Sequence, residues 1–226
     1  MKAAFLWLPL ACSILPAARA PAAGPDLAAS MDNWLVEKWE DDPIQVRVEG
    51  GALRASTHSP ENGVMLWLKR DLPADFVLEY DFTPLSQTGF FLVFFCARGT
   101  DGHDVLSPEA QADRTARTLF KKYTDGKVRC YHVSYRRGEE ANCNLRKNPG
   151  LVLLKQQPLA ELLPRGKTAH VRLTKRGARI LLEVNGKQFM DYTDRDAAIA
   201  GGRLALRQVY DSEASYKNIT LTELRQ

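Results

Sequence analysis

Cysteine is scarce in this sequence, and the few cysteines show no pairing pattern. Of the four, Cys12 lies in a segment that we expect to be removed, so Cys96, Cys130 and Cys143 remain. An odd number of thiols cannot pair completely within one chain, and their spacing matches no zinc-binding pattern. Two alternatives stay open, one disulfide with a free thiol or three thiols buried in a large core.

A strong charge of one sign is also missing. The chain has 31 Lys and Arg against 27 Asp and Glu, which gives a formal net charge of +4 with both signs interspersed. Nucleic-acid-binding proteins usually carry a basic stripe or arm, so we expect no nucleic-acid partner. The sequence also lacks internal repeats, a glycine-rich phosphate loop and, after residue 15, any apolar run long enough to span a bilayer.

The first residues have the pattern of a secretory signal peptide. Lys2 supplies a positive start, residues 3–15 are a short apolar run, and small residues at 18 and 20 mark a cleavage site. Pro21 would follow that cut and is a poor substrate there, so cleavage after Ala22 is the alternative. We expect a leader over residues 1–22, a linker over 23–30 and one domain over 31–226, in the periplasm or outside the cell.

Short strand-like runs dominate the rest of the chain. Residues 76–82 alternate strictly between apolar and polar side chains, which is typical of a half-buried strand. Residues 90–96 are continuously apolar and rich in aromatic side chains, which favours a strand covered on both faces over a short buried helix. Asn185-Gly186 predicts a tight hairpin. Further strands are expected at 45–48, 52–57, 64–68, 170–175, 179–184, 187–192, 203–209 and 216–224.

So many short strands with turns between them predict an all-β fold, a two-sheet antiparallel β-sandwich of the jelly-roll type. Hydrophobic residues make up 45% of the chain, enough for a two-sheet core. Helices are expected only as short segments around 108–118 and 159–163, and a long loop is expected over about 97–118.

Residues 127–148 (KVRCYHVSYRRGEEANCNLRKN) form the most informative segment, a polar hairpin. Two alternating runs flank the turn at 138–140, and side chains alternate with period two. Only one parity of pairing therefore places apolar side chains opposite apolar ones. That parity turns one set toward solvent, namely His132, Ser134, Asn142, Asn144, Arg146 and Asn148, and a second set toward the core, namely Tyr131, Val133, Tyr135, Cys143 and Leu145.

The predicted polar face has the side chains that sugar hydroxyls need. Asparagine offers paired hydrogen-bond donors and acceptors. Arg146 can donate two parallel hydrogen bonds to a uronate carboxylate. The ordinary pKa of histidine suits His132 to act as a general base. The alternative is a solvated or loop-covered face on which the asparagines bind nearby backbone. A Ser134–His132 nucleophile pair is not expected, because residues two apart on a strand rarely touch.

The same hairpin resembles a known family. Residues 131–135 (YHVSY) and 144–150 (NLRKNPG), preceded by 102–105 (GHDV) and 122–123, resemble the YesU-like family of uncharacterised bacterial proteins. The closing segment, 166–224, looks like the last strands of laminin-G-like and related sandwiches. The resemblance covers most of the chain after the leader, and it implies the concanavalin-A-like jelly-roll fold and a link to polysaccharide breakdown. It supplies no established reaction.

Other groups of residues are weaker candidates. The loop at 98–118 carries side-chain oxygens of the kind that bind Ca²⁺, but their spacing matches no known calcium loop. The alternative interpretation is a solvated lid. The candidate residues in this loop are Asp101, His103, Asp104, Asp113 and Arg114. Separately, three tryptophans are candidate sugar platforms that also suit core packing, namely Trp34, Trp39 and Trp67.

We therefore expect a carbohydrate ligand, and several functions remain open. In a polysaccharide lyase, Arg146 and Asn144 would neutralise a uronate carboxylate while His132 or Tyr123 takes a proton. A glycoside hydrolase needs two carboxylates, which Glu79 and Asp81 could supply. The alternatives are a non-catalytic carbohydrate-binding module and a laminin-G-like interaction domain. The expected site comprises His132, Arg146 and Tyr123 as catalytic residues, Ser134, Asn142, Asn144, Lys147 and Asn148 as substrate-binding residues, and no cofactor unless Ca²⁺ binds.

Overall fold

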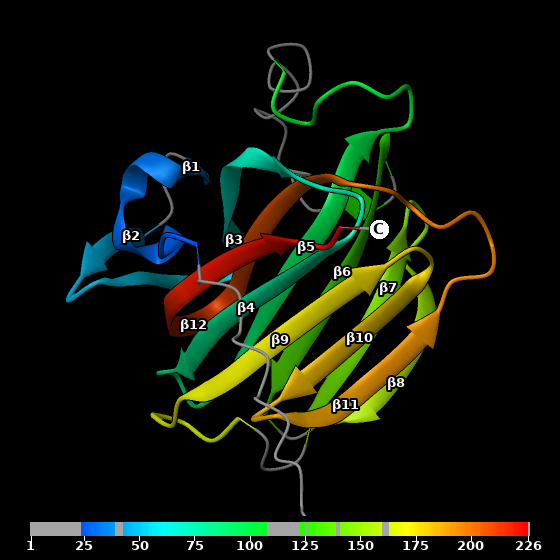
Figure 1. Ribbon diagram of the computed structural model, residues 1–226. Helices are drawn as coiled ribbons and strands as arrows, with labels where there is room; N and C mark the ends of the chain where they lie inside the picture. Colours follow the sequence, from blue (N-terminus) through cyan, green and yellow to red (C-terminus); the bar gives the residue numbers. More distant parts are fainter. Residues whose placement is uncertain are drawn as a thin grey trace, which may run out of the picture.

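The computed structural model is an antiparallel all-β structure (Figure 1). It describes residues 24–38, 43–107, 123–124, 126–138, 141–159 and 163–225, with residues 59–62 described by their backbone alone. The short 3₁₀ turns η1 (Leu27–Ala29) and η2 (Met31–Asn33) precede the strands. The strands are β1 (Trp34–Glu37), β2 (Ile44–Glu49), β3 (Ala52–Leu72), β4 (Phe76–Pro84), β5 (Gly89–Gly99), β6 (Val128–Arg137), β7 (Asn142–Asn148), β8 (Val152–Pro158), β9 (Ala169–Arg176), β10 (Arg179–Val184), β11 (Lys187–Thr193) and β12 (Gly202–Glu223).

Two long strands, β3 and β12, belong to both layers of a sandwich. Residues 202–209 of β12 pair with β5 and with residues 63–72 of β3, whereas residues 211–223 pair with β4 and with residues 53–58 of β3. One layer therefore runs β1-β3-β12-β5-β6-β7-β8, and the other runs β2-β3-β12-β4-β9-β10-β11. The predicted two-sheet sandwich is confirmed.

The crossing between layers requires an unusually close approach of two backbones. Tyr210, between the two halves of β12, has a positive φ of 65°. Gly63 of β3 pairs with the preceding residue, Val209, and a Cβ on Gly63 would lie 2.1 Å from the carbonyl oxygen of Gln208, so only glycine fits. The sequence patterns at 52–57 and 64–68, and at 203–209 and 216–224, therefore belong to two continuous strands rather than four.

The main core lies between the layers. Phe76, Leu78, Tyr80 and Phe82 of β4 all point into it, as their strict alternation predicts. The opposite wall comes from alternate residues of the second layer, namely Phe91, Val93, Phe95, Tyr131, Val133, Tyr135, Cys143 and Leu145. Burying each large side chain contributes roughly 1.5–3 kcal/mol, so this interior stabilises both layers at once.

A second, smaller cluster covers the other face of β5. Leu92 and Phe94 point away from the main core and pack with Trp67 of β3 and with Tyr123. Residues 90–96 are therefore buried on both faces, as their unbroken apolar run predicts, and the short-helix alternative is wrong. This second cluster matters for function because it lies on the same side of the sheet as the polar hairpin face.

The structure tests several of the local features expected from the sequence. Asn185 and Gly186 both have positive φ, 51° and 73°, in the predicted hairpin between β10 and β11. Cys96, Cys130 and Cys143 are free and buried, which decides between the two alternatives for the thiols. The strands β1 and β8 were not predicted. The leader, Trp39 and most of the segments around 108–118 and 159–163 lie outside the described residues.

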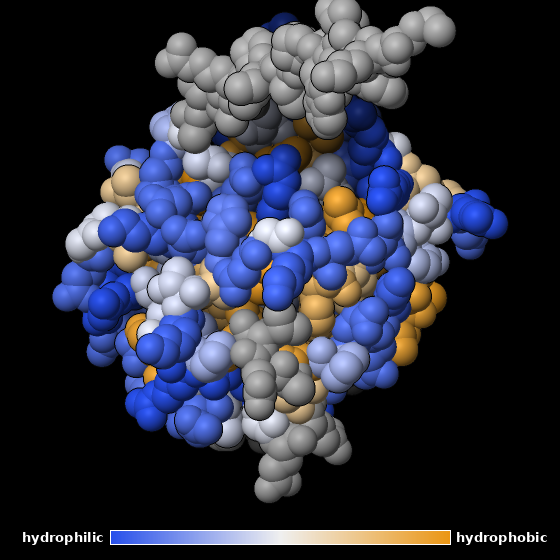
Figure 2. All heavy atoms as spheres, turned by 60° about the horizontal axis from the view of Figure 1, so that its bottom comes forward, coloured by the Kyte–Doolittle hydropathy of each residue, from blue (hydrophilic) through white to orange (hydrophobic). Residues whose placement is uncertain are grey.

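The described surface is mixed in character. Figure 2 shows one side of the molecule, on which hydrophilic residues cover most of the described surface and smaller hydrophobic areas lie between them. Exposed large hydrophobic residues are Val36, Val152, Leu153 and Tyr210, which come from three different strands. In the described part of the chain, no helix has the length and apolarity that crossing a membrane requires.

Candidate functional site

The pairing of β6 with β7 follows the register expected from the sequence. Ser134 lies opposite Asn144, His132 opposite Arg146 and Arg136 opposite Asn142, with Asn148 opposite Cys130 at the far end. Because antiparallel partners share a face, these polar side chains lie together. Their neighbours along each strand point into the main core.

This face does not look toward solvent, and that expectation is wrong. His132 and Ser134 are each 1% exposed, Asn148 is 2% exposed and Asn144 is 9% exposed. Leu92, Phe94 and Trp67 of the second hydrophobic cluster share this face, and the ring centroids of Phe94 and His132 lie 4.8 Å apart. The polar residues therefore sit in a low-dielectric environment, where an unpaired polar group is costly.

The polar face continues across β5 onto β12. Leu92 lies opposite both Ser134 and Arg207, so one row runs Arg207, Leu92, Ser134, Asn144 across four strands. Arg207 is 5% exposed, and burial lowers the pKa of its guanidinium to about 9, which still leaves it charged at neutral pH. Arg207 was not expected from the sequence, although an arginine directly after the apolar residues 204–206 is the signal that could have found it.

Three oxygens on this face lack a hydrogen-bond partner. Ser134 Oγ, Asn144 Oδ1 and Asn148 Oδ1 are buried, and none of the described groups bonds to them. The other end of the Asn144 amide is used, because its Nδ2 donates to Asn142 Oδ1 at 3.0 Å. A buried polar atom without a partner costs about 1–3 kcal/mol, so these oxygens point to a ligand or water as their partner.

His132 is arranged as a hydrogen-bond donor. Its Nδ1 lies 2.9 Å from the Asn148 amide nitrogen, which donates, so the ring proton sits on Nε2. Burial, with smaller contributions from the charges of Arg146 and Arg207, lowers the pKa of His132 to about 3. The ordinary pKa expected for a general base does not hold, and a neutral ring with an Nε2–H is what this face presents.

Arg146 and Lys147 differ in their placement. Arg146 lies on the polar face and its Nη1 donates to the Leu151 carbonyl at 2.6 Å, so this side chain also holds the turn into β8. Lys147 points to the opposite side of the sheet, where its Nζ lies 2.8 Å from Asp194 Oδ2. Lys147 is therefore not part of the polar face, as the alternation of side chains along β7 requires.

A buried carboxylate lies at the β1 side of the same layer. Glu37 is 5% exposed. Tyr123 donates its hydroxyl to Glu37 Oε2 at 2.7 Å, and Trp67 donates its indole N–H to the same oxygen at 2.7 Å. Burial lowers the pKa of Arg207, and the nearby charge of Glu37 opposes this with a smaller effect that raises it. Sequence analysis identified Tyr123 and missed Glu37, because only the pairing of β1 with β3 brings that strand here.

The two tryptophan candidates that the structure describes, Trp34 and Trp67, are structural. Trp67 is completely buried, and Trp34 is 3% exposed and donates its indole N–H to the Leu27 carbonyl at 2.8 Å. Neither offers an open sugar platform.

The acids considered for a hydrolase lie elsewhere. Glu79 accepts from Arg172 at 2.6 Å and Asp81 contacts His170 at 2.9 Å, all on β4 and β9 of the other layer. They cannot serve as a carboxylate pair on the polar face. Glu37 is the one carboxylate that the described residues place beside it.

The described loop candidates for calcium are engaged in ion pairs. Asp104 is held by Arg203 at 2.5 Å and Asp101 contacts His103 at 3.1 Å. Among the described residues, no three acids, histidines or cysteines gather as metal ligands would. Asp113 and Arg114 lie outside the described residues.

Comparison with known proteins agrees with the fold. A family model described as a domain of unknown function, DUF1961, matches residues 26–221. The uncharacterised protein YesU of Bacillus subtilis (strain 168) is 24% identical over 189 residues, which are 78% of this chain and 84% of that protein.

Solved structures extend the comparison. A Bacillus subtilis protein of unknown function with a galectin-like fold superposes with a TM-score of 0.78 and 22% identity, over 91% of this chain and 98% of that one. The carbohydrate-binding module CBM66 from Bacillus subtilis has a TM-score of 0.54 and 14% identity, over 84% and 96% of the two chains. At these identities, both show the fold alone.

Proposed function

We propose that this chain, which belongs to the DUF1961 family, binds an oligosaccharide or polysaccharide on the polar face of β6, β7 and β12. A shared fold alone does not determine function. The proposal therefore depends on the residues of the face, and the carbohydrate-binding module with the same fold adds to its plausibility.

The observation that carries the proposal is the set of three partnerless oxygens. Ser134 Oγ, Asn144 Oδ1 and Asn148 Oδ1 accept, while the Nε2–H of His132 donates from the same face. A sugar hydroxyl donates one hydrogen bond and accepts others, so neighbouring hydroxyls match a mixed set of donors and acceptors. These atoms are buried in the chain as described, so a saccharide satisfies them only when the groups that cover the face move aside.

The apolar residues on this face suit the same ligand. Leu92 and Phe94 lie between the polar groups of β12 and those of β6. Sugar rings present C–H groups between their hydroxyls, and ligand sites commonly combine apolar walls with a few placed polar groups. Arg207 and Arg146 would favour a ring that carries a carboxylate, as in a uronate.

Titration calorimetry with a panel of neutral and acidic oligosaccharides tests this function. We expect binding by the unaltered chain and about tenfold weaker binding by Asn144→Ala, the loss of one or two ligand hydrogen bonds. Gln188→Ala, which removes an exposed amide from β11, is the matched control and should bind like the unaltered chain. Equal affinities for both variants, or no binding across the panel, would remove the proposal.

A lyase reaction on the same face is the second candidate, favoured by the contact between Tyr123 and Glu37. The Tyr123 oxygen could take the C5 proton of a uronate while its own proton passes to Glu37, to which it already donates. The electron pair of the C5–H bond then forms the C4–C5 double bond as the bond from C4 to its oxygen breaks, and the leaving oxygen takes the proton held on Tyr123, which Glu37 then reprotonates. Ultraviolet absorbance of the same mixtures decides this point, because only elimination produces that conjugated product.

A further inference from the structure

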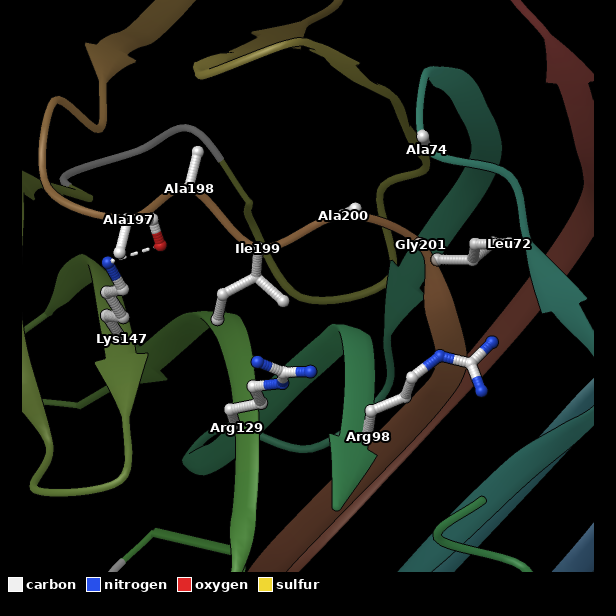
Figure 3. A pocket seen from close by; sticks show the side chains of 10 residues that line it. All are labelled: Leu72, Ala74, Arg98, Arg129, Lys147, Ala197, Ala198, Ile199, Ala200 and Gly201. Carbon is white, nitrogen blue, oxygen red and sulfur yellow. Dashed lines mark hydrogen bonds between the residues drawn. The ribbon is translucent and has the colours of Figure 1, made fainter. Parts of the chain in front are cut away.

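A hollow opens at one end of the sandwich, between the two layers (Figure 3). Its volume is about 720 Å³. Arg98 at the end of β5, Arg129 at the start of β6 and Lys147 of β7 form one side of it. Leu72, Ala74 and the segment 197–201 between β11 and β12 form the other.

This hollow is separate from the polar face. Arg129 and Lys147 alternate with Cys130 and Asn148 along their strands, so they point to the opposite side of the sheet. They share that side with Tyr131 and Leu145, which enter the main core. A ligand here would therefore meet different side chains from a saccharide on the polar face.

A buried network holds one wall of the hollow in place. Tyr131 donates its hydroxyl to Asp194, and the same oxygen accepts from the Ile199 backbone N–H at 3.0 Å. Lys147 bonds Asp194 and also donates to the Ala197 carbonyl at 3.0 Å. The segment 194–199 is thus fixed from two strands, and the small side chains of Ala197, Ala198 and Ala200 leave its backbone accessible.

The charge of the hollow is positive because of one residue. Arg98 and Arg129 lie directly opposite each other on β5 and β6, an arrangement of like charges that weakens a sheet. Asp71 neutralises Arg98 at 2.6 Å, and Asp194 neutralises Lys147. Arg129 is exposed and makes no ion pair with any described acid, and its guanidinium points toward the segment that contains Ile199 (Figure 3).

We propose that this hollow is an oxyanion-binding site, in which Arg129 pairs with a carboxylate, sulfate or phosphate group. A planar guanidinium binds such groups through two parallel hydrogen bonds. The anion gives Arg129 the counter-charge that Asp71 gives Arg98, and the neighbouring alanine and leucine side chains leave room for the body of the ligand. The site does not depend on the function proposed for the polar face.

Binding measurements on the full chain test the site, with sulfate, phosphate, glucuronate and glucose as separate probes. We expect sulfate, phosphate or glucuronate to bind and glucose to show no binding at this site. Arg129→Gln should weaken anion binding roughly tenfold or more, the usual effect of a charge-assisted pair. Arg176→Gln removes the same charge from an exposed position on β9 and should leave anion affinity unchanged.

The pattern of outcomes separates this site from the polar face. Binding of glucuronate alone assigns the anion to an acidic sugar, and binding of sulfate or phosphate alone assigns it to a free ion or ester. Loss of anion binding in Arg129→Gln with unchanged saccharide binding supports a separate site. Equal anion affinity in Arg129→Gln and Arg176→Gln, or no anion binding at all, overturns the proposal.

Discussion

At the scale of single residues, the alternation of side chains along a strand predicted which face of the sheet each side chain lies on. It did not predict whether that side chain is buried. The parity of the hairpin placed Ser134, His132 and Asn144 on one face, because side-chain direction in a strand follows from sequence spacing alone. Their burial was not predictable in this way. Burial depends on neighbours that come from other parts of the chain, and Leu92, Phe94 and Trp67 share this face from β5 and β3.

The partnerless hydroxyl of Ser134 gives a stability prediction at this scale. Ser134→Ala removes a buried oxygen that bonds to nothing in the free protein, so we expect stability unchanged or raised by up to about 1 kcal/mol. Urea unfolding measures this free energy. A loss above about 2 kcal/mol would mean that the hydroxyl has a structural partner and is not reserved for a ligand.

At the scale of strands, features encoded by neighbouring residues were predicted from the sequence. Features that depend on pairing between strands far apart in the chain were not. The hairpin at Asn185-Gly186 is encoded by two adjacent residues, so it was found. Arg207 was missed because it meets the polar face through the pairing of β12 with β5, and Glu37 was missed because it does so through the pairing of β1 with β3 and of β3 with β12. These strands are far apart in sequence. The bending of β3 and β12 between layers was hidden for the same reason.

The bend in β3 makes its own prediction. Gly63→Ala places a Cβ against the backbone of Gln208, so we expect a loss of about 3 kcal/mol in the free energy of unfolding. Gly24→Ala is the matched control, since its Cβ would meet nothing nearer than 3.9 Å. Denaturant titration of both variants measures the difference, and similar stabilities would show that the two strands can separate at the bend without cost.

At the scale of the whole molecule, the buried imidazole of His132 couples folding to pH. Its pKa is lowered to about 3 in the folded chain, whereas an unfolded histidine titrates near ~6.5. The unfolded state therefore binds the proton first, and stability is lost as pH falls below the unfolded pKa. The loss approaches about 1.4 kcal/mol per pH unit and stops only near the folded pKa.

Unfolding free energies between neutral pH and about 4.5 measure this dependence. His132→Gln removes the titrating ring, so the difference in stability between the two proteins should shrink steadily as the pH falls. The carboxyl of Asp194, whose pKa lies below its usual range despite burial because Lys147 and Tyr131 bond it, contributes only at lower pH. Parallel pH profiles for the two proteins would show that the ring is charged, or solvated, in the native state.

The three interior thiols have a consequence for the chemistry the chain tolerates. Burial raises the pKa of Cys96 and of Cys130 to about 12 and that of Cys143 higher still. The reactive species in oxidation and disulfide exchange is the thiolate, which is almost absent under such conditions. We therefore expect these three thiols to resist oxidation and disulfide exchange for as long as the domain stays folded.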